Sequence, residues 1–208
     1  MRRFALLVLP LLVATPLVAQ MVKPGSRNPA AVTGGVYEVD PNHTLIGWHV
    51  DHMGFSDCCG ILGSSTGTLT LDAKNPDAAK VDITIPIAKV TTANAGLTAH
   101  LLRPGKDGSK PDFFGAAPAD ARFVSKSVKT SGTRAKITGN LTINGITRPV
   151  VLDAEFVGAG KAAATMGGKE NVVFQAKAVI KRSDFEIGFL VPPVSDDVTL
   201  VTTAAFQK

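Results

Sequence analysis

The sequence predicts an all-β fold, a single closed antiparallel β-barrel of about eight strands. Apolar and polar residues alternate along several segments, and turns rich in Gly and Asn separate these segments. Only one stretch in the middle of the chain lacks the alternation. A period of two sends one row of side chains inward and the next row to solvent, which is typical of an antiparallel sheet with one wet face.

The alternation is clearest in four segments of the chain. Each segment places an apolar residue at every second position, with polar or small residues between. The rows predicted to face inward are Val81, Ile83, Ile85 and Ile87; Val150, Leu152, Ala154 and Phe156; Val172, Phe174, Ala176, Ala178 and Ile180; and Val198, Leu200, Thr202, Ala204 and Phe206.

The connections between these segments carry turn signals. Asn144-Gly145 between two apolar runs predicts a tight hairpin, and Ser131-Gly132 predicts another. Asn75-Pro76-Asp77 predicts a short helical turn. Residues 158–168 contain four glycines, so we expect a long and flexible hairpin end there.

Residues 92–115 break the strand rhythm. Residues 94–102 predict a short helix with Asn94 as its N-cap, followed by a loop and the pair Phe113 and Phe114. A helix inserted between two barrel strands is well placed to cover one end of the barrel. The two aromatic side chains would either close the mouth of a cavity or plug the barrel end as ordinary core.

The N-terminus predicts export. Arg2 and Arg3 precede an apolar run that is too short to span a bilayer, and small residues follow it, so residues 1–20 are typical of a secretory signal peptide. Residues 21–35 are rich in Gly, Pro, Ser and Asn and predict a flexible leader. Residues 36–208 are then one barrel domain, and loss of Arg2 and Arg3 would reduce the net charge from +5 to +3.

Cys58 and Cys59 are the only cysteines and are adjacent. Neighbours on an extended chain point to opposite faces, so they cannot join distant segments of the barrel. The two thiols are therefore free, paired with each other, or paired with another molecule.

The sequence predicts neither catalytic nor metal-ligating residues, and no cofactor. It contains no nucleophile elbow, zinc-protease motif or phosphate-binding loop. His49 and His52 are three residues apart and face opposite sides of a strand, so they cannot share a metal. Positive and negative residues are interspersed, which argues against nucleic acid as a partner.

The inward rows favour a lumen that holds a ligand. They mix medium-sized residues with small ones such as Gly139 and Ala176, which leaves room for a flexible hydrocarbon. Each buried CH₂ contributes about 0.8 kcal/mol, so a long apolar chain needs few polar contacts. We expect the ligand to contact Trp48, Val50, Leu71, Ile83, Ile85, Phe113, Phe114, Phe123, Leu141, Phe156, Phe174 and Leu200.

Seven blocks of residues together resemble one known family. They are residues 37–44, 48–54, 112–114, 123–125, 139–150, 182–185 and 194–198, and the closest block is the hairpin at residues 139–150. Their order and spacing from Tyr37 to the C-terminus resemble the YceI-like family. The resemblance implies a lipocalin-like eight-stranded barrel, exported to the periplasm, that binds, carries or sequesters an isoprenoid lipid or quinone, with possible transient contact with the inner membrane.

Two positions depart from the family pattern. Thr44 replaces the usual Ser and keeps the hydroxyl, whereas Glu186 stands where the family has Gly. A bend with positive φ at that point would suit Gly188 better than Glu186. The nearby Arg182-Ser183-Asp184 predicts either a turn held by its own polar side chains, which we favour, or a polar rim for a lipid head group.

Three functional hypotheses follow. The first is an exported, non-enzymatic protein that holds a long apolar lipid for transport, storage or stress response. The second is a quinone-dependent redox partner or enzyme that uses Cys58, Cys59 or His52. The third is a structural or stress-related secreted barrel with a filled core.

Overall fold

The computed structural model describes residues 23–208, so the predicted signal peptide at residues 1–20 lies outside the described residues. The described chain is mostly β-structure with one α-helix, α1 (Ala95–Leu102). Its strands are β1 (Gly35–Val39), β2 (Leu45–His52), β3 (Ser56–Leu62), β4 (Thr66–Leu71), β5 (Lys80–Ile85), β6 (Ala121–Ser131), β7 (Arg134–Ile143), β8 (Ile146–Lys161), β9 (Glu170–Lys181) and β10 (Asp197–Gln207). Its short 3₁₀ helices are η1 (Pro29–Ala31), η2 (Pro76–Ala78), η3 (Ile87–Lys89), η4 (Lys106–Gly108), η5 (Ala164–Met166) and η6 (Arg182–Phe185).

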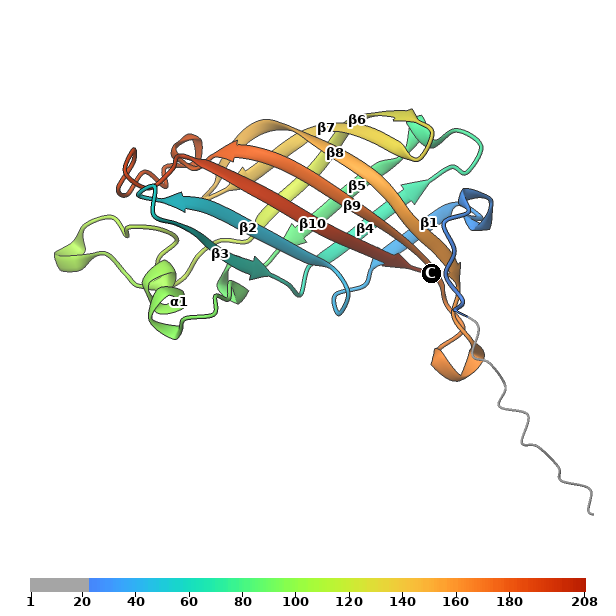
Figure 1. The fold of residues 1–208 in the computed structure, drawn as a ribbon, viewed down its shortest axis with the longest axis horizontal. Coiled ribbons are helices and arrows are strands. Elements are labelled where there is room, and N and C mark those ends of the chain that lie inside the picture. The colour runs from blue at the N-terminus through green and yellow to red at the C-terminus, as the bar shows by residue number, and fades with distance from the viewer. Residues whose placement is uncertain (1–22) are drawn as a thin grey trace, which may run out of the picture.

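The strands form the predicted closed, lipocalin-like antiparallel barrel (Figure 1). Its order is β1-β4-β5-β6-β7-β8-β9-β10, and the pairing of β1 with β10 closes it. β10 pairs with β1 through residues 206–207 and with β2 through residues 199–203. β1 and β2 therefore lie end to end beside β10 and together fill one strand position of the barrel. β4 pairs with β1 and β3 pairs with β2, so these two strands fill the next position.

The break between β1 and β2 is fixed by buried polar groups. The Asp40 amide donates to the Ala205 carbonyl at 2.8 Å. The Thr44 hydroxyl donates to the same carbonyl and accepts from the Ala205 amide, both at 3.0 Å. Thr44 is 1% exposed, so the hydroxyl that replaces the family's Ser satisfies both backbone groups in the interior.

The predicted hairpins are confirmed. Asn144 and Gly145 link β7 to β8 with φ of 51° and 75°, as a tight hairpin with positive φ at both central residues requires. Gly132 links β6 to β7 with φ of 60°. The expectation of a flexible end over residues 158–168 was wrong in its first part, because β8 extends through a bulge to Lys161 and pairs with β9 there.

The helix prediction is also confirmed. The Asn94 side chain accepts from the Leu97 amide at 3.0 Å and caps α1. A backbone pair between Ile61 and Thr91 joins the segment around α1 to the outer edge of β3. None of the helices within residues 23–208 has the length and apolar content needed to cross a membrane.

The inward rows pack as predicted. On β9, Val172, Ala176, Ala178 and Ile180 are buried, whereas the intervening Gln175 and Lys177 are exposed. The buried side chains form clusters toward each end of the barrel, and a further cluster extends under α1.

Residues 24–34, which we call the N-terminal strap, lie against the barrel at the end opposite α1 (Figure 1). The Ser26 and Ala159 backbones exchange hydrogen bonds of 2.9 Å, which attaches the strap to the free edge of β8. This segment belongs to the part of the chain for which a flexible leader is predicted from composition.

Candidate functional site

The barrel interior holds two apolar chambers. The strap-side chamber is a cavity of about 230 Å³ between β4–β10 and the N-terminal strap. The helix-side chamber is a cavity of about 210 Å³ between β2, β3, α1 and the loop at residues 186–195 that follows β9. Both are lined mainly by carbon atoms, as expected of sites that bind apolar molecules.

A waist of side chains separates the two chambers. Along β9, Ala176 lines the strap-side chamber and Ile180 lines the helix-side chamber, with buried Ala178 between them. Along β7, Ile137 lines the strap-side chamber and Ile143 lines the helix-side chamber, with buried Leu141 between them. Leu141 and Ala178 lie in one core cluster and form the waist.

Most residues that the sequence predicts as ligand contacts lie at these chambers. Leu71, Ile83, Phe123, Phe156 and Phe174 line the strap-side chamber. Trp48, Val50, Phe113, Phe114 and Leu200 line the helix-side chamber. Leu141 is at the waist, and Ile85 packs against the cluster under α1.

Sequence reasoning missed the loop that walls the helix-side chamber. Phe185, Ile187, Phe189 and Val194 line this chamber, although none belongs to a β-strand. The spacing of Phe185, Ile187 and Phe189 at every second position was a signal for a buried face. It also missed the strap residues Pro29 and Val32 in the other chamber.

Arg182 holds this loop in place. It is 5% exposed, and its guanidinium donates to the carbonyls of Ile187, Phe189, Val194 and Ser195, each at 2.8 Å. Burial lowers the pKa of Arg182, and the charge of Asp196 partly opposes this shift. The four backbone carbonyls are therefore the main hydrogen-bond partners that stabilise the buried charge of Arg182.

The predicted turn at Arg182-Ser183-Asp184 is present as η6. The Ser183 amide and hydroxyl both donate to the Asp196 carboxylate, at 2.8 Å. Burial tends to raise the pKa of Asp196, but these hydrogen bonds and the charges of Lys181 and Arg182 bring it below the usual value. The cluster therefore links the two ends of the loop.

Glu186 takes the backbone conformation that we expected Gly188 to take. Glu186 has φ 60° and ψ 23°, whereas Gly188 has no positive φ, so the expected shift by two residues was wrong. The Glu186 amide closes η6 by donating to the carbonyls of Arg182 and Ser183. These bonds fix the left-handed turn at this position, at a steric cost of about 1–2 kcal/mol for a residue with a Cβ.

An aromatic cluster joins α1 to the same loop. The rings of His100, Phe113 and Phe189 meet edge to face, with centroids 5.1 to 5.8 Å apart. His100 also bonds Asp112 at 2.9 Å, and Arg103 bonds Asp112 at 2.5 Å. Hydrogen bonds from Arg103 and then His100 lower the pKa of Asp112. Phe113 thus lies in the chamber wall rather than in solvent.

The groups considered for redox chemistry lie on both faces of the wall that contains β3, with His52 and Cys58 facing the helix-side chamber. Cys58 lines the helix-side chamber, while Cys59 is exposed on the other face, and both thiols are free. Burial raises the pKa of Cys58, and the charges of Cys59 and Asp57 add to this shift. A thiol with a raised pKa is a weak nucleophile at neutral pH. Within residues 23–208, no three His, Cys, Asp or Glu side chains are placed to hold a metal ion.

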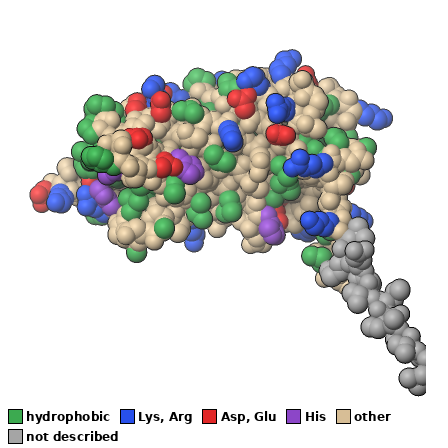
Figure 2. Space-filling model, in the orientation of Figure 1, with side chains coloured by type: hydrophobic (Ala, Val, Ile, Leu, Met, Phe, Trp, Pro, Cys, Tyr) green, Lys and Arg blue, Asp and Glu red, His purple; other side chains and the backbone are tan. Residues whose placement is uncertain are grey.

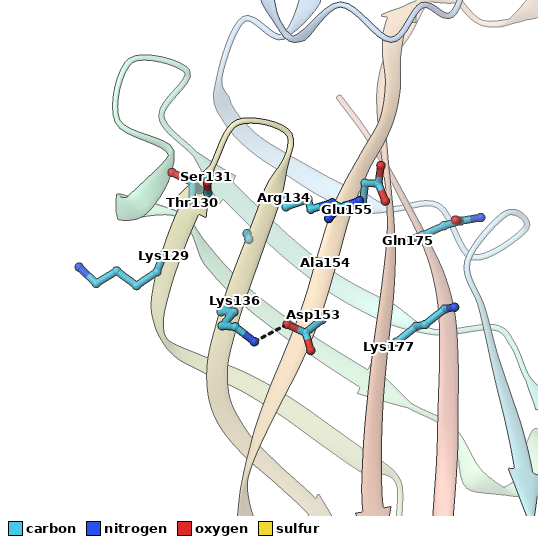
Figure 3. A pocket seen from close by; sticks show the side chains of 11 residues that line it. Lys129, Thr130, Ser131, Arg134, Lys136, Asp153, Ala154, Glu155, Gln175 and Lys177 are labelled. Atoms are coloured by element: carbon cyan, nitrogen blue, oxygen red, sulfur yellow. Dashed lines mark hydrogen bonds and ion pairs between the residues drawn. The ribbon is translucent and has the colours of Figure 1, made fainter.

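A larger hollow, of about 690 Å³, lies on the outer face of β6–β9 (Figure 3). Its walls are exposed polar and charged side chains, including Lys129, Lys136, Asp153 and Lys177, and Lys136 pairs with Asp153 at 2.7 Å. Figure 2 shows positive and negative side chains mixed over the molecular face that it presents, without an extended area of one sign. Neither feature suits an apolar ligand, so the lumen is the candidate site.

Comparisons with known proteins agree with this geometry. The family model described as the YceI-like domain matches residues 37–206. Protein YceI of Escherichia coli O157:H7 is 37% identical over 168 residues, which cover 79% of this chain and 83% of that protein.

Solved structures show the same fold. The Campylobacter jejuni YCEI protein is similar with a TM-score of 0.59 and 32% identity, over 76% of this chain and 89% of that chain. A polyisoprenoid-binding domain from Saccharophagus degradans is similar in fold, with a TM-score of 0.56 and 11% identity, over 82% of this chain and 97% of that chain. With a family model over most of the chain, a relative of this identity and a lumen where the family motifs converge, the chain belongs to the YceI-like family.

Proposed function

We propose that this protein binds a long apolar lipid in the two chambers of its barrel and is not an enzyme. The observation that carries the proposal is the lumen itself: two carbon-lined cavities in line along the barrel, of about 230 and 210 Å³. Two chambers in line on either side of a waist of Leu141 and Ala178 match an elongated, flexible molecule better than a compact one.

The lipid class proposed is a polyisoprenoid or an isoprenoid quinone. The polyisoprenoid-binding domain from Saccharophagus degradans shares the barrel fold, which supports the isoprenoid class. Both chambers carry a few polar groups: His52, Cys58 and His100 line the helix-side chamber, and Thr130, Arg134 and Thr202 line the strap-side chamber. A small polar head beside the imidazoles of His52 and His100 would leave the apolar tail to extend past the waist.

The raised pKa of Cys58, which makes its thiol a weak nucleophile, argues for binding rather than redox catalysis. The signal-peptide pattern at residues 1–20 supports export to the periplasm, where the bound lipid would be transported, stored or withheld during stress.

We also propose transient contact with the inner membrane through the rim of the helix-side chamber. Phe55, at the β2–β3 turn, is 89% exposed, and Met53 in the same turn and Leu190 in the 186–195 loop are 41% and 45% exposed. The Met53 amide donates to the Pro193 carbonyl at 3.0 Å, so the turn and the 186–195 loop form one rim. Hydrophobic side chains gather at this end of the molecule in Figure 2. Exposed apolar rims are typical of membrane contact sites.

Phe55→Ser should slow transfer of a fluorescent isoprenoid from the protein to phosphatidylcholine vesicles severalfold, because the rim loses its most exposed apolar side chain. Val36→Ser is the matched control, since Val36 is 56% exposed on β1, away from this rim. Equal transfer rates for the two variants would refute the membrane-contact proposal and leave lipid binding unaffected.

The direct test of lipid binding is native mass spectrometry of protein released gently from the periplasm, followed by extraction of any bound molecule. We expect a discrete added mass that extracts as an isoprenoid. A bare protein that also fails to take up offered isoprenoid alcohols would contradict the proposal and favour a barrel whose core is filled by its own side chains.

A further inference from the structure

The N-terminal strap forms part of the end wall of the strap-side chamber. Pro29 and Val32 line the chamber, and Val32 packs against the core cluster that contains Tyr37, Leu69 and Val172. The rest of this end wall comes from the turn after β6 and from the segment around η2. The strap is therefore the wall that an apolar chain meets after passing the waist.

Glycines on β8 make room for the strap. A Cβ built on Gly160 would lie 2.1 Å from the Pro24 carbonyl oxygen, and one on Gly158 would lie 3.0 Å from the Ser26 carbonyl oxygen. Gly160 has no positive φ, so its backbone would accept a side chain if the strap were absent. Glycine is therefore required at position 160 because the strap backbone packs against it, and not because of the backbone conformation of β8.

A polar anchor holds the other end of the strap. The Thr33 amide and hydroxyl donate to the Glu170 carboxylate at 3.0 and 2.7 Å, and the fully buried Tyr37 hydroxyl donates to it at 2.5 Å. The Lys208 ammonium donates to the Thr33 hydroxyl at 2.7 Å. Burial would raise the pKa of Glu170, but these hydrogen bonds and the charge of Lys208 lower it below its ordinary value.

We propose that the N-terminal strap sets the length of the apolar chain that the barrel accepts, with Pro29 and Val32 as the residues that meet its far end. This inference rests on the proposed function. Each CH₂ that enters the lumen adds about 0.8 kcal/mol to binding. The gain stops where the chain reaches the strap, because further carbons must stay in water or displace the strap from β8.

The test compares affinities for isoprenoid alcohols of increasing length, from farnesol through geranylgeraniol to longer polyprenols. Each alcohol competes with the apolar fluorophore N-phenyl-1-naphthylamine. For the parent protein, affinity should rise with length and then level off. Gly160→Ala should move that limit to longer alcohols and bind the longest one roughly tenfold more tightly, because the strap is displaced and more carbons are buried.

Gly25→Ala is the matched control. It adds the same methyl group within the strap, where a Cβ would meet nothing within 4 Å, and its length limit should equal the parent's. If Gly160→Ala and Gly25→Ala show the same limit, the strap does not determine length. If the parent binds none of the alcohols or the fluorophore, the proposed function itself fails.

A reversible lock tests the inference without displacing the strap. Ser26 and Ala159 exchange both backbone hydrogen bonds, and such pairs have Cα atoms about 5.5 Å apart, within the range for a disulfide. Ser26→Cys with Ala159→Cys is made in a Cys58→Ser, Cys59→Ser background. The locked protein should show a length limit no longer than that of the reduced protein, with equal affinity of the two forms for farnesol. A locked protein whose affinity goes on rising beyond the length at which the parent levels off would overturn the inference, including where Gly160→Ala does not fold.

Discussion

Arg182→Met should destabilise the protein by about 3 kcal/mol or more and abolish lipid retention. Methionine fills much of the same space but donates no hydrogen bond, so the four carbonyls that Arg182 serves lose their donor. Each buried acceptor left unsatisfied costs about 1–3 kcal/mol, and water that enters the loop recovers part of this. The loop that carries Ile187, Phe189 and Val194 then leaves the wall of the helix-side chamber.

Urea unfolding gives the free energy of unfolding, and native mass spectrometry gives the retained lipid. Lys181→Met is the control, because Lys181 is an adjacent but exposed cation that pairs with Asp197 at 3.0 Å, and exposed pairs contribute about 0–1 kcal/mol. Arg182→Lys keeps the charge but cannot reach four carbonyls from one ammonium group. Wild-type stability in Arg182→Lys would show that the charge, and not the branched guanidinium, holds the loop.

Leu141→Asp should destabilise the barrel by about 5 kcal/mol or more, a loss comparable with the whole stability of many domains. Leu141 is 6% exposed at the waist, where its neighbours include Phe123, Val150 and Ala178. The substitution removes packing worth about 2–5 kcal/mol and buries a carboxyl without a partner. Any protein that still folds should bind no apolar lipid, since the waist then carries a polar group.

The loss should depend on pH in a defined direction. Desolvation raises the pKa of the introduced carboxyl in the folded state above its unfolded value of about 3.9. The folded state then binds the proton more tightly, so stability falls as pH rises from the unfolded toward the folded pKa. Leu141→Asn has nearly the same shape without the charge, and its loss should not vary over this pH range. Equal pH profiles for the two variants would show that position 141 is open to water.

Local sequence patterns predicted most of the strand architecture. The alternation on β9 identified its buried row, because strand side chains point to opposite faces whatever the neighbouring strand is. Asn144-Gly145 located a hairpin, because positive φ at both positions requires such residues. Asn94 predicted the start of α1, because its side chain accepts a hydrogen bond from the Leu97 amide three residues later. The ordered motifs were sufficient to identify the YceI-like family, which the comparisons confirm.

The candidate site was predictable only in part. Ten of the twelve expected contact residues line a chamber, because inward rows of a barrel face the lumen by geometry. Their division between two chambers was not predictable, since it depends on Leu141 and Ala178, from strands that are not adjacent, packing in one core cluster. Whether these residues contact a lipid stays a prediction.

The sequence by itself determined most of the strands, their inward rows and the hairpins, because each of these depends on residues within a few positions of one another. It determined the family through the order of several short motifs along the chain. Only the tertiary structure decided the rest. Arg182 became the centre of a loop because carbonyls 5 to 13 residues away turn toward it. Glu186 adopted a left-handed turn because two carbonyls of η6 hold its amide. Residues 24–34 became a chamber wall because Gly158 and Gly160, far along the chain, leave space for their backbone.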